Sequence, residues 1–140
     1  VKTNVIIGEN AAGKTSFLEA IDILSRGRSF RTNKTESLVQ AGQDELYVGA
    51  LAGPSKKKLE IRKGKNKTRV FVDSKEEKQQ SKITENLAIQ SIHPGSHALI
   101  EGSPSERRAY LDWGLFHVEQ NFKQEWSKYL KILRQRNIFI

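Results

Sequence analysis

The chain has 140 residues, about the size of one domain, and 24 Lys and Arg against 16 Asp and Glu give it a net charge of +8. It has no cysteine, which excludes a disulfide scaffold, a thiolate metal site and a cysteine nucleophile. No apolar run approaches the length of a membrane span, so we expect no membrane insertion. The chain starts at Val1 and stops inside a helical pattern, and we expect it to be a fragment that is truncated at both ends.

The first half of the sequence predicts a strand, a helix, a long loop and a second strand. Residues 5–7 form a short apolar run before Gly8, which is typical of a buried parallel strand. Apolar residues at helical spacing then predict a helix that ends near Gly27. Residues 28–45 are polar and predict a loop, and residues 46–51 predict a strand.

The middle of the sequence predicts a β-hairpin, because apolar and polar residues alternate over 59–62 and 70–73 around a turn-like stretch. Residues 74–80 are predicted to be a loose connector. A short helix over 83–87 and a strand over 88–92 follow.

A helix is predicted to start at Ser103, with Pro104 in its first turn and Glu106 completing a capping box. This helix and a second one are expected to bury apolar faces. Their expected buried residues are Ala109, Tyr110, Trp113, Phe116, Phe122, Trp126, Tyr129, Leu130 and Leu133. We expect an ATP-binding lobe with a basic β-hairpin over 1–102 and the start of a helical lobe over 103–140.

One motif carries chemistry, because residues 8–15 match G-x-x-x-x-G-K-[ST] in full. Glycines at both ends allow the backbone to form a nest of inward-facing amides, and a helix N-terminus adds its positive dipole. Lys14 is expected to reach the β- and γ-phosphates, and the Thr15 hydroxyl to ligate Mg²⁺. The predicted nucleotide-binding residues are Gly8, Glu9, Asn10, Ala11, Ala12, Gly13, Lys14, Thr15 and Ser16.

Positive charge is concentrated in a few stretches, which favours a polyanionic partner such as nucleic acid. Residues 56–69 alone carry eight bases against one acid. A solvated surface is the alternative for each stretch. The candidate DNA-binding residues are Arg28, Arg31, Lys57, Arg62, Lys65, Lys67 and Arg107.

A P-loop alone does not identify the reaction, so two other functions stay open. One is a nucleic-acid-binding module that ignores ATP, and the other is a P-loop kinase of a small metabolite. The strand 70–72 followed by Asp73 imitates a Mg²⁺-binding strand end, but its place in an antiparallel hairpin argues against that role.

Several blocks of the sequence resemble a known family. Residues 8–21 are similar to the P-loop and helix of ABC-type ATPases of the chromosome-maintenance and recombination group. Residues 27–31, 102–113 and 131–137 resemble segments of the RecF family of bacterial recombination mediators, in the same order. The resemblance implies an α/β P-loop NTPase, an ABC-type head lobe with a mixed sheet and β-hairpin, followed by the start of a helical lobe.

The resemblance also implies a function in DNA repair, DNA replication restart and the SOS response. Members of the family bind ATP and Mg²⁺, dimerise around ATP, and bind single-stranded, gapped and duplex DNA in the cytoplasm. They act with RecO and RecR to load the recombinase. The intact protein is expected to be a weak ATPase. The Walker B and signature motifs are absent from this chain, so we assign it no catalytic residue and expect it to be inactive alone.

Overall fold

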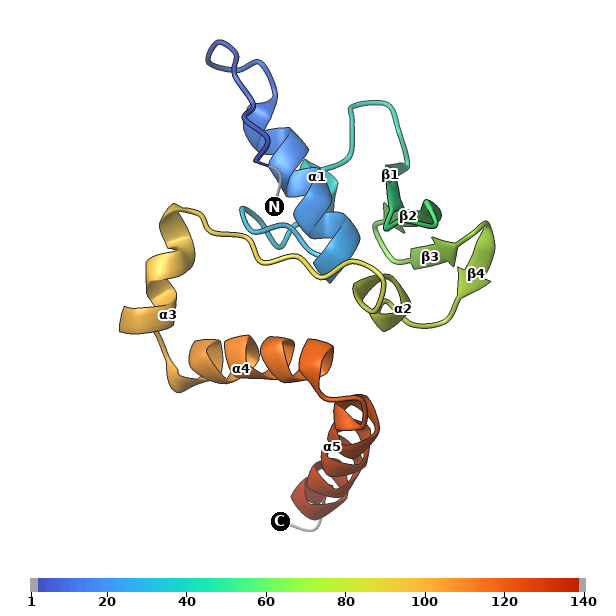
Figure 1. The fold of residues 1–140 in the computed structure, drawn as a ribbon, viewed down its shortest axis with the longest axis vertical. Helices are drawn as coiled ribbons and strands as arrows, with labels where there is room; N and C mark the ends of the chain where they lie inside the picture. The colour runs from blue at the N-terminus through green and yellow to red at the C-terminus, as the bar shows by residue number, and fades with distance from the viewer. Residues whose placement is uncertain (1–2, 139–140) are drawn as a thin grey trace. The chain divides into compact units, whose positions relative to one another are not determined.

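The structure is a computed structural model that describes residues 3–138, and it comprises two compact units. The first unit ends at Ser91 and the second begins at Ile92. Figure 1 labels helices and strands along the chain. The division at residue 102 into an ATP-binding lobe and a helical lobe stays a prediction about function.

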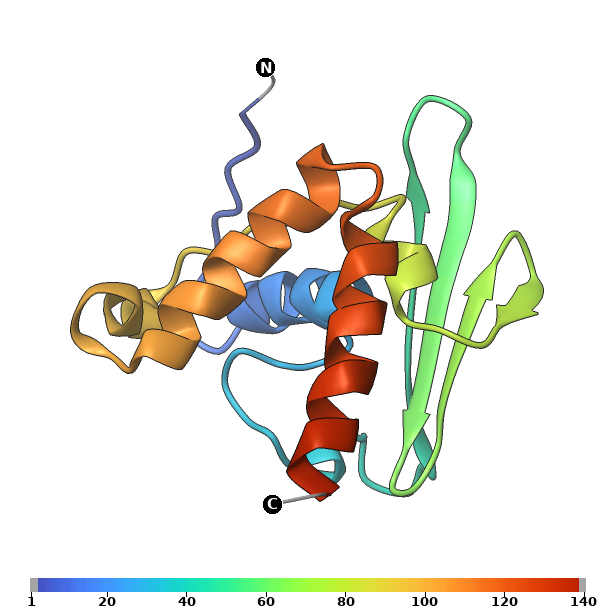
Figure 2. The ribbon, with the colours of Figure 1, turned by 90° about the horizontal axis from the view of Figure 1, so that it is seen from below.

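The first unit contains a four-stranded antiparallel sheet whose strands follow one another in chain order (Figure 2). The strands are β1 (Glu45–Ala52), β2 (Lys57–Gly64), β3 (Thr68–Val72) and β4 (Lys75–Glu77). The predicted strand at 46–51 and the predicted hairpin are therefore confirmed as β1 and as β2 with β3. Alternating apolar residues suit this sheet, because only one of its faces is covered by helices.

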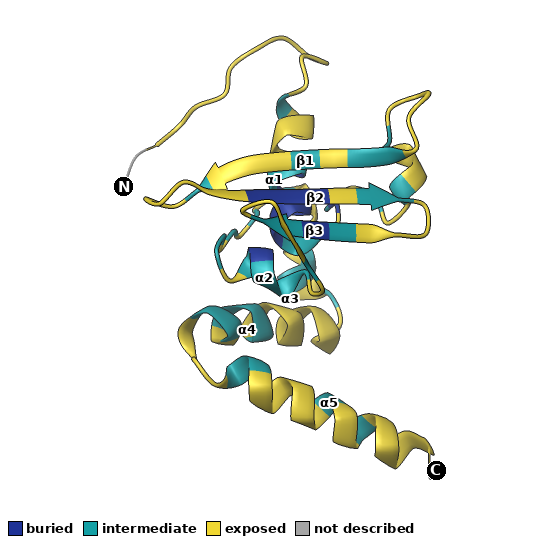
Figure 3. Ribbon diagram, turned by 90° about the vertical axis from the view of Figure 1, so that its right-hand side faces the viewer, coloured by how far each residue is buried: buried dark blue, intermediate teal, exposed yellow. Residues whose placement is uncertain are grey.

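The core of the first unit lies between the sheet and two helices, α1 (Lys14–Arg26) and the short α2 (Ser81–Thr84). The 3-10 turn η1 (Thr35–Ser37) lies in the loop that was predicted between α1 and the sheet. Figure 3 shows the buried stretch in the middle of β2. Among the described residues, the buried apolar side chains of this core are Ile23, Leu24, Leu59, Ile61, Val70 and Ile83.

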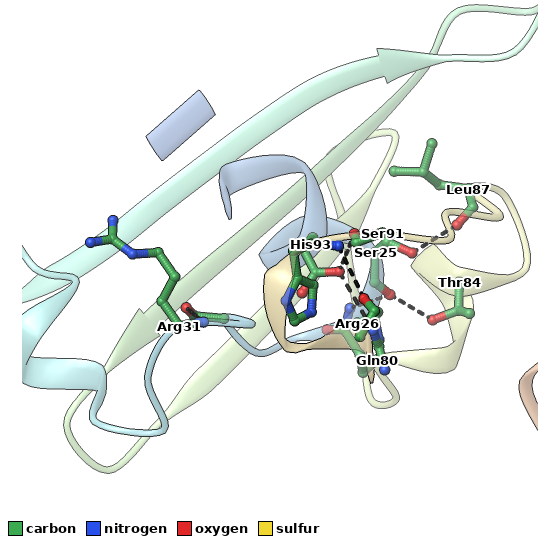
Figure 4. Close-up of polar contacts among 11 residues, drawn as sticks. Ser25, Arg26, Arg31, Gln80, Thr84, Leu87, Ser91 and His93 are labelled. Atoms are coloured by element: carbon green, nitrogen blue, oxygen red, sulfur yellow. Dashed lines mark hydrogen bonds and ion pairs between the residues drawn. The ribbon is translucent and has the colours of Figure 1, made fainter. Parts of the chain in front are cut away.

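The C-terminal end of α1 is held by side chains from β2 and α2. Gly27 ends the helix as predicted, in the left-handed conformation with φ of 72°. The Lys63 ammonium donates to the Gly27 carbonyl at 2.9 Å, and the Thr84 hydroxyl donates to the Ser25 carbonyl at 2.8 Å. The Ser25 hydroxyl in turn donates to the Leu87 carbonyl at 3.0 Å (Figure 4). The bonds from Lys63 and Thr84 satisfy carbonyls at the end of α1 that have no partner inside the helix.

The second unit is helical in the described residues. It contains the 3-10 turn η2 (Pro94–His97), α3 (Ala98–Glu101), α4 (Pro104–Val118) and α5 (Phe122–Ile138). The predicted start of α4 after Ser103, with a proline in its first turn, is confirmed. Among residues 3–138, no helix has both the length and the apolar character that crossing a membrane requires.

Two predicted strands are not formed. Residues 4–9 have no regular structure, and Val5 and Ile7 are 75% and 88% exposed. Residues 88–92 also lack strand structure. A short apolar run becomes a strand only where a neighbouring strand supplies hydrogen-bond partners. The sheet formed by the described residues is antiparallel throughout, and neither run joins it.

Two local predictions are also corrected. The stretch 74–80 is not entirely a loose connector, because β4 forms inside it after a turn with positive φ at Asp73 and Ser74. The capping box of α4 is not formed, since the Ser103 side chain makes no cap hydrogen bond to the helix. Its hydroxyl contacts the Ser105 hydroxyl instead, which is a competing local hydrogen bond.

The predicted apolar faces of α4 and α5 are only partly covered. Trp113 and Phe116 are half-buried, whereas Tyr110 is 45% exposed and Ala109 is also exposed. On α5, Phe122, Leu130 and Leu133 are half-buried, while Trp126 and Tyr129 are exposed. An apolar stripe on a helix is buried only where another element packs on it, and none of the described residues of α3, α4 or α5 is fully buried.

Candidate nucleotide-binding site

The segment that matches the phosphate-binding motif forms an exposed turn immediately before α1. The backbone N–H of Ala12 donates to the Glu9 carbonyl at 3.2 Å. Ala11 and Gly13 have φ of 67° and 90°, so two residues in the turn adopt the left-handed conformation. Gly8 does not adopt it, and glycine is therefore needed for backbone conformation at Gly13 rather than at Gly8.

The N-terminus of α1 is free to bind an anion. Gly13 is the N-cap residue and offers no side chain, and the first helical hydrogen bond runs from the Phe17 N–H to the Gly13 carbonyl at 2.9 Å. The backbone N–H groups of Lys14, Thr15 and Ser16 therefore have no acceptor inside the helix. No acidic residue stands in the first turn of α1, so nothing there competes with a bound anion.

Lys14 joins the two ends of the loop. Its ammonium donates to the Gly8 carbonyl at 2.8 Å and to the Glu9 carbonyl at 2.7 Å. A lysine ammonium has three N–H donors, so one remains for a ligand after these two bonds. The positive charge, the remaining donor and the uncapped amides meet at one helix end, which is the donor set that a polyphosphate requires.

Thr15 lies exposed on the first turn of α1, and its hydroxyl is the side-chain oxygen of the motif that would hold a Mg²⁺ ion. The part of the chain that the structure describes contains no cluster of three or more histidine, aspartate or glutamate side chains that could hold a metal ion alone. Asp73, at the end of the strand that imitates a Mg²⁺-binding strand, accepts a hydrogen bond from the Lys58 backbone N–H at 2.8 Å.

The structure brings together two basic segments that are far apart in the sequence. The bond from Lys63 to the Gly27 carbonyl places the end of β2 beside the start of the loop 28–34. That loop carries exposed Arg28 and Arg31, and the turn that follows β2 carries exposed Lys65 and Lys67. These four candidate DNA-binding residues therefore lie on two adjacent segments at one end of the sheet.

Two other candidates lie elsewhere. Lys57 is at the opposite end of β2 from Lys65, about 25 Å away along the strand at the usual rise per residue. Its ammonium donates to the Asn86 side chain at 2.8 Å. Arg107 belongs to the second unit, where its guanidinium donates to the Gly102 carbonyl at 3.0 Å just after α3.

Arg62 takes part in the packing of the outer face of the sheet, the face away from α1. Its guanidinium lies 5.5 Å from the Tyr47 ring centroid and 5.8 Å from the Phe71 ring centroid. It also forms an ion pair with Glu45 at 3.6 Å. These contacts hold its planar group between two aromatic rings, which is a stabilising arrangement for arginine.

A buried carboxylate lies at the centre of this outer face. The Tyr47 hydroxyl donates to Glu60 at 2.8 Å, and the Lys58 ammonium lies 3.0 Å from the other carboxylate oxygen. These two hydrogen bonds, the one from Tyr47 above all, hold the pKa of Glu60 below its usual value. The same bond to Glu60 raises the pKa of Tyr47.

Replacing Tyr47 by phenylalanine is expected to raise the pKa of Glu60 towards its usual value. A carboxylate whose pKa is lowered by folding stabilises the fold above its unfolded pKa, and this contribution is lost as the pH falls through the folded pKa. The substitution should therefore destabilise the protein at neutral pH and have a smaller effect in acid. Carboxyl chemical shifts during a pH titration measure the pKa, and Tyr129→Phe, at an equally exposed tyrosine, is the control.

Sequence reasoning did not single out Glu19 or Lys63. Glu19 is buried on α1 against Ser29, and Lys63 is held by Gly27, with sequence separations of 10 and 36 residues. No local pattern predicts these pairs. Glu19 lies opposite the apolar residues that predicted the helix, so helical spacing alone placed it on the exposed side.

The AAA domain family matches residues 2–138, and the chain therefore belongs to the AAA domain family. Its relatives include proteins named DNA replication and repair protein RecF. The one from Xanthomonas oryzae pv. oryzae strain MAFF 311018 is 38% identical over 144 residues, covering 98% of this chain and 40% of the relative. The one from Hydrogenovibrio crunogenus is 40% identical over 136 residues, covering 96% and 38%. The chain thus spans about two fifths of the length of these relatives.

A solved structure described as the recombination mediator protein RecF-ATP in the RecFOR pathway is similar in fold, with a TM-score of 0.78 and 33% identity. The similar region covers 94% of this chain and 38% of the chain in that structure. A second, described as RecF-ATPrS, gives a TM-score of 0.72 at 33% identity, with 93% of this chain and 36% of that chain covered. The resemblance to RecF and the α/β P-loop fold class inferred from the sequence are both confirmed.

Proposed function

We propose that this chain is the ATP-binding part of a RecF-like protein of DNA replication and repair. The observation that carries the proposal is the complete phosphate-binding loop at the uncapped N-terminus of α1, with Lys14 tied to the loop and one donor left. The RecF relatives support it, and so does the similar solved structure whose description includes ATP.

In this proposal residues 8–16 bind the triphosphate of ATP. The amides at the start of α1 and the Lys14 ammonium neutralise phosphate charge, and Thr15 is the residue of this chain that holds Mg²⁺. Mg²⁺ held there would supply further positive charge against the negative charge of the phosphates. ATP-dependent dimerisation and weak hydrolysis by the intact protein belong to the same proposal, as does action with RecO and RecR in recombinase loading and the SOS response.

The proposed DNA interface is the surface formed by the loop 28–34 and the turn 64–67, which we call the basic surface. Four exposed cations on it, Arg28, Arg31, Lys65 and Lys67, come from segments that Lys63 holds together. Clustered cations release counterions when they bind phosphates, which makes such binding strong at low salt and independent of sequence. This surface fits single-stranded, gapped or duplex DNA.

A DNA-binding titration with and without ATP and Mg²⁺ tests the proposed function. The proposal expects that ATP changes DNA affinity, and that raising the salt concentration weakens binding in both states. If DNA binding is salt-sensitive but the DNA affinity is the same with and without ATP, the result would instead favour the ATP-independent nucleic-acid-binding module. Phosphoryl transfer to a small metabolite without any DNA binding would favour the kinase.

A further inference from the structure

Glu19 is a charged residue inside the first unit with only 7% of its surface exposed. Burial of a carboxylate is costly unless hydrogen bonds or an opposite charge compensate for the lost water. Glu19 lies on α1 one helical turn after Thr15, so it belongs to the same rigid element as the proposed phosphate-binding residues. Its partners are therefore linked directly to the nucleotide site.

The first partner of Glu19 is Ser29, which is itself only 6% exposed. The Ser29 hydroxyl donates to a carboxylate oxygen of Glu19. The same hydroxyl oxygen accepts from the backbone N–H of Arg31 at 2.9 Å and of Thr32 at 3.2 Å. A serine hydroxyl has one donor and two acceptor positions, so this hydroxyl is fully used. It ties the turn 29–32 of the basic surface to α1.

The second partner of Glu19 is Arg31, whose guanidinium lies 3.5 Å from the other carboxylate oxygen. The Arg31 side chain is 56% exposed, and an ion pair with so much exposure to water contributes little on its own. The buried hydrogen bond to Ser29 is therefore the main connection. The guanidinium stays largely available to a phosphate group.

The other half of α1 is fastened to different parts of the first unit. Asp22, 1% exposed, accepts a hydrogen bond from the Ser91 hydroxyl at 2.7 Å. Near the helix end, the Gln80 side chain donates to the Leu24 carbonyl at 3.0 Å. These bonds fix the C-terminal half of α1, whereas Glu19 lies in the N-terminal half, close in sequence to the proposed phosphate-binding residues.

We propose that Glu19 and Ser29 are positioning residues that couple phosphate binding at residues 8–15 to the conformation of the loop 28–34. This inference rests on the proposed function and deepens it, because it names the connection through which nucleotide alters the DNA-binding basic surface. Neither residue contacts the phosphates. Each acts through the elements it joins, the helix α1 and the turn 29–32.

Hydrogen exchange of backbone amides tests the coupling in the full chain, with ATPγS and Mg²⁺ as the probe. In the unsubstituted protein, the nucleotide should slow exchange at residues 8–15 and also at residues 29–34. We expect a factor of about five or more at 29–34, which is the lower end of typical coupling between two sites. Measuring both segments in one sample separates nucleotide binding from its transmission.

Glu19→Ala removes the link to α1 but leaves the Ser29 hydroxyl to hold the turn 29–32. In this variant the nucleotide should still slow exchange at residues 8–15 and should no longer slow it at 29–34. Glu19→Gln, which keeps an acceptor oxygen, should restore the effect. Glu36→Ala is the matched control, because Glu36 is exposed on η1 in the same region. If Glu19→Ala does not fold, Ser29→Ala serves as the second variant, with the same expected loss.

Each outcome is decisive. Slower exchange at 8–15 with no change at 29–34 in the unsubstituted protein would overturn the coupling and leave the proposed function intact. The coupling would also be overturned if the nucleotide slowed exchange at 29–34 by the same factor in Glu19→Ala as in the unsubstituted protein. A purely structural role of Glu19 would change the exchange rates with and without nucleotide alike and would leave that factor unchanged. No slowing at either segment would overturn the proposed nucleotide binding together with the coupling.

Discussion

Replacing Lys14 by alanine is expected to abolish ATP binding. Hydrogen bonds made by a charged group contribute about 1.5–3 kcal/mol each, which corresponds to about 10–150-fold in affinity. Lys14 also ties the Gly8 and Glu9 carbonyls of the loop together. The substitution therefore removes both a phosphate contact and the shape of the loop, and we expect a loss of about 100-fold or more. Equilibrium titration with a fluorescent ATP analogue measures it.

The matched control is Lys128→Ala on α5. Lys128 is an exposed helical lysine that pairs with Glu125 at 2.8 Å, and it belongs to the second compact unit. Its removal should leave ATP affinity unchanged. Circular dichroism of both variants checks that α1 and the sheet still form. Normal ATP affinity in a folded Lys14→Ala protein would contradict the proposed site.

Reversing two charges at the turn after β2, with Lys65→Glu and Lys67→Glu together, is expected to weaken DNA binding about tenfold or more at moderate salt. Each phosphate contact contributes about one to the slope of log affinity against log salt concentration, so the slope should also fall by about two. Both residues are exposed and neither belongs to the buried core, so the fold should be unaffected. Fluorescence anisotropy at several salt concentrations measures affinity and slope together.

The control for this pair is Lys75→Glu with Lys78→Glu. These lysines are exposed on β4 and just after it, and their substitution changes the net charge by the same amount. A general effect of net charge would weaken DNA binding equally in both variants. A specific basic surface predicts a large effect for the first pair and a small one for the second. Equal losses would therefore contradict the assignment of the surface to the turn 64–67.

Local sequence signals predicted the elements that depend on nearby residues. The glycine and lysine spacing of residues 8–15 indicated the phosphate-binding loop, and the apolar spacing after it indicated α1 with its end at Gly27. The alternating pattern of β2 and β3 predicted their hairpin, because both strands and their turn lie within a few residues of one another. The proposed nucleotide site could be predicted for the same reason, because its residues are consecutive in the sequence.

The predictions of strands at 5–7 and 88–92 were wrong, and the sequence of these segments alone does not reveal why. A strand needs a partner strand, and the available partner is decided by the whole fold. In the described residues the sheet is completed by β4, which lies in a segment predicted to be a connector. The buried Glu60 was missed in the same way, because the Tyr47 hydroxyl on β1 reaches it only once β1 and β2 pair.

The sequence by itself therefore determined the family, the phosphate-binding loop, the helix that follows the loop, and the basic character of the chain. Each of these features depends only on residues close together in the sequence or on the overall composition. Only the tertiary structure decided which cations share a surface and how that surface is joined to α1. Lys63 reaches Gly27 across 36 residues, and Ser29 folds back onto Glu19. Such contacts form because burial of the common core brings distant segments together, and no short stretch of sequence specifies them alone.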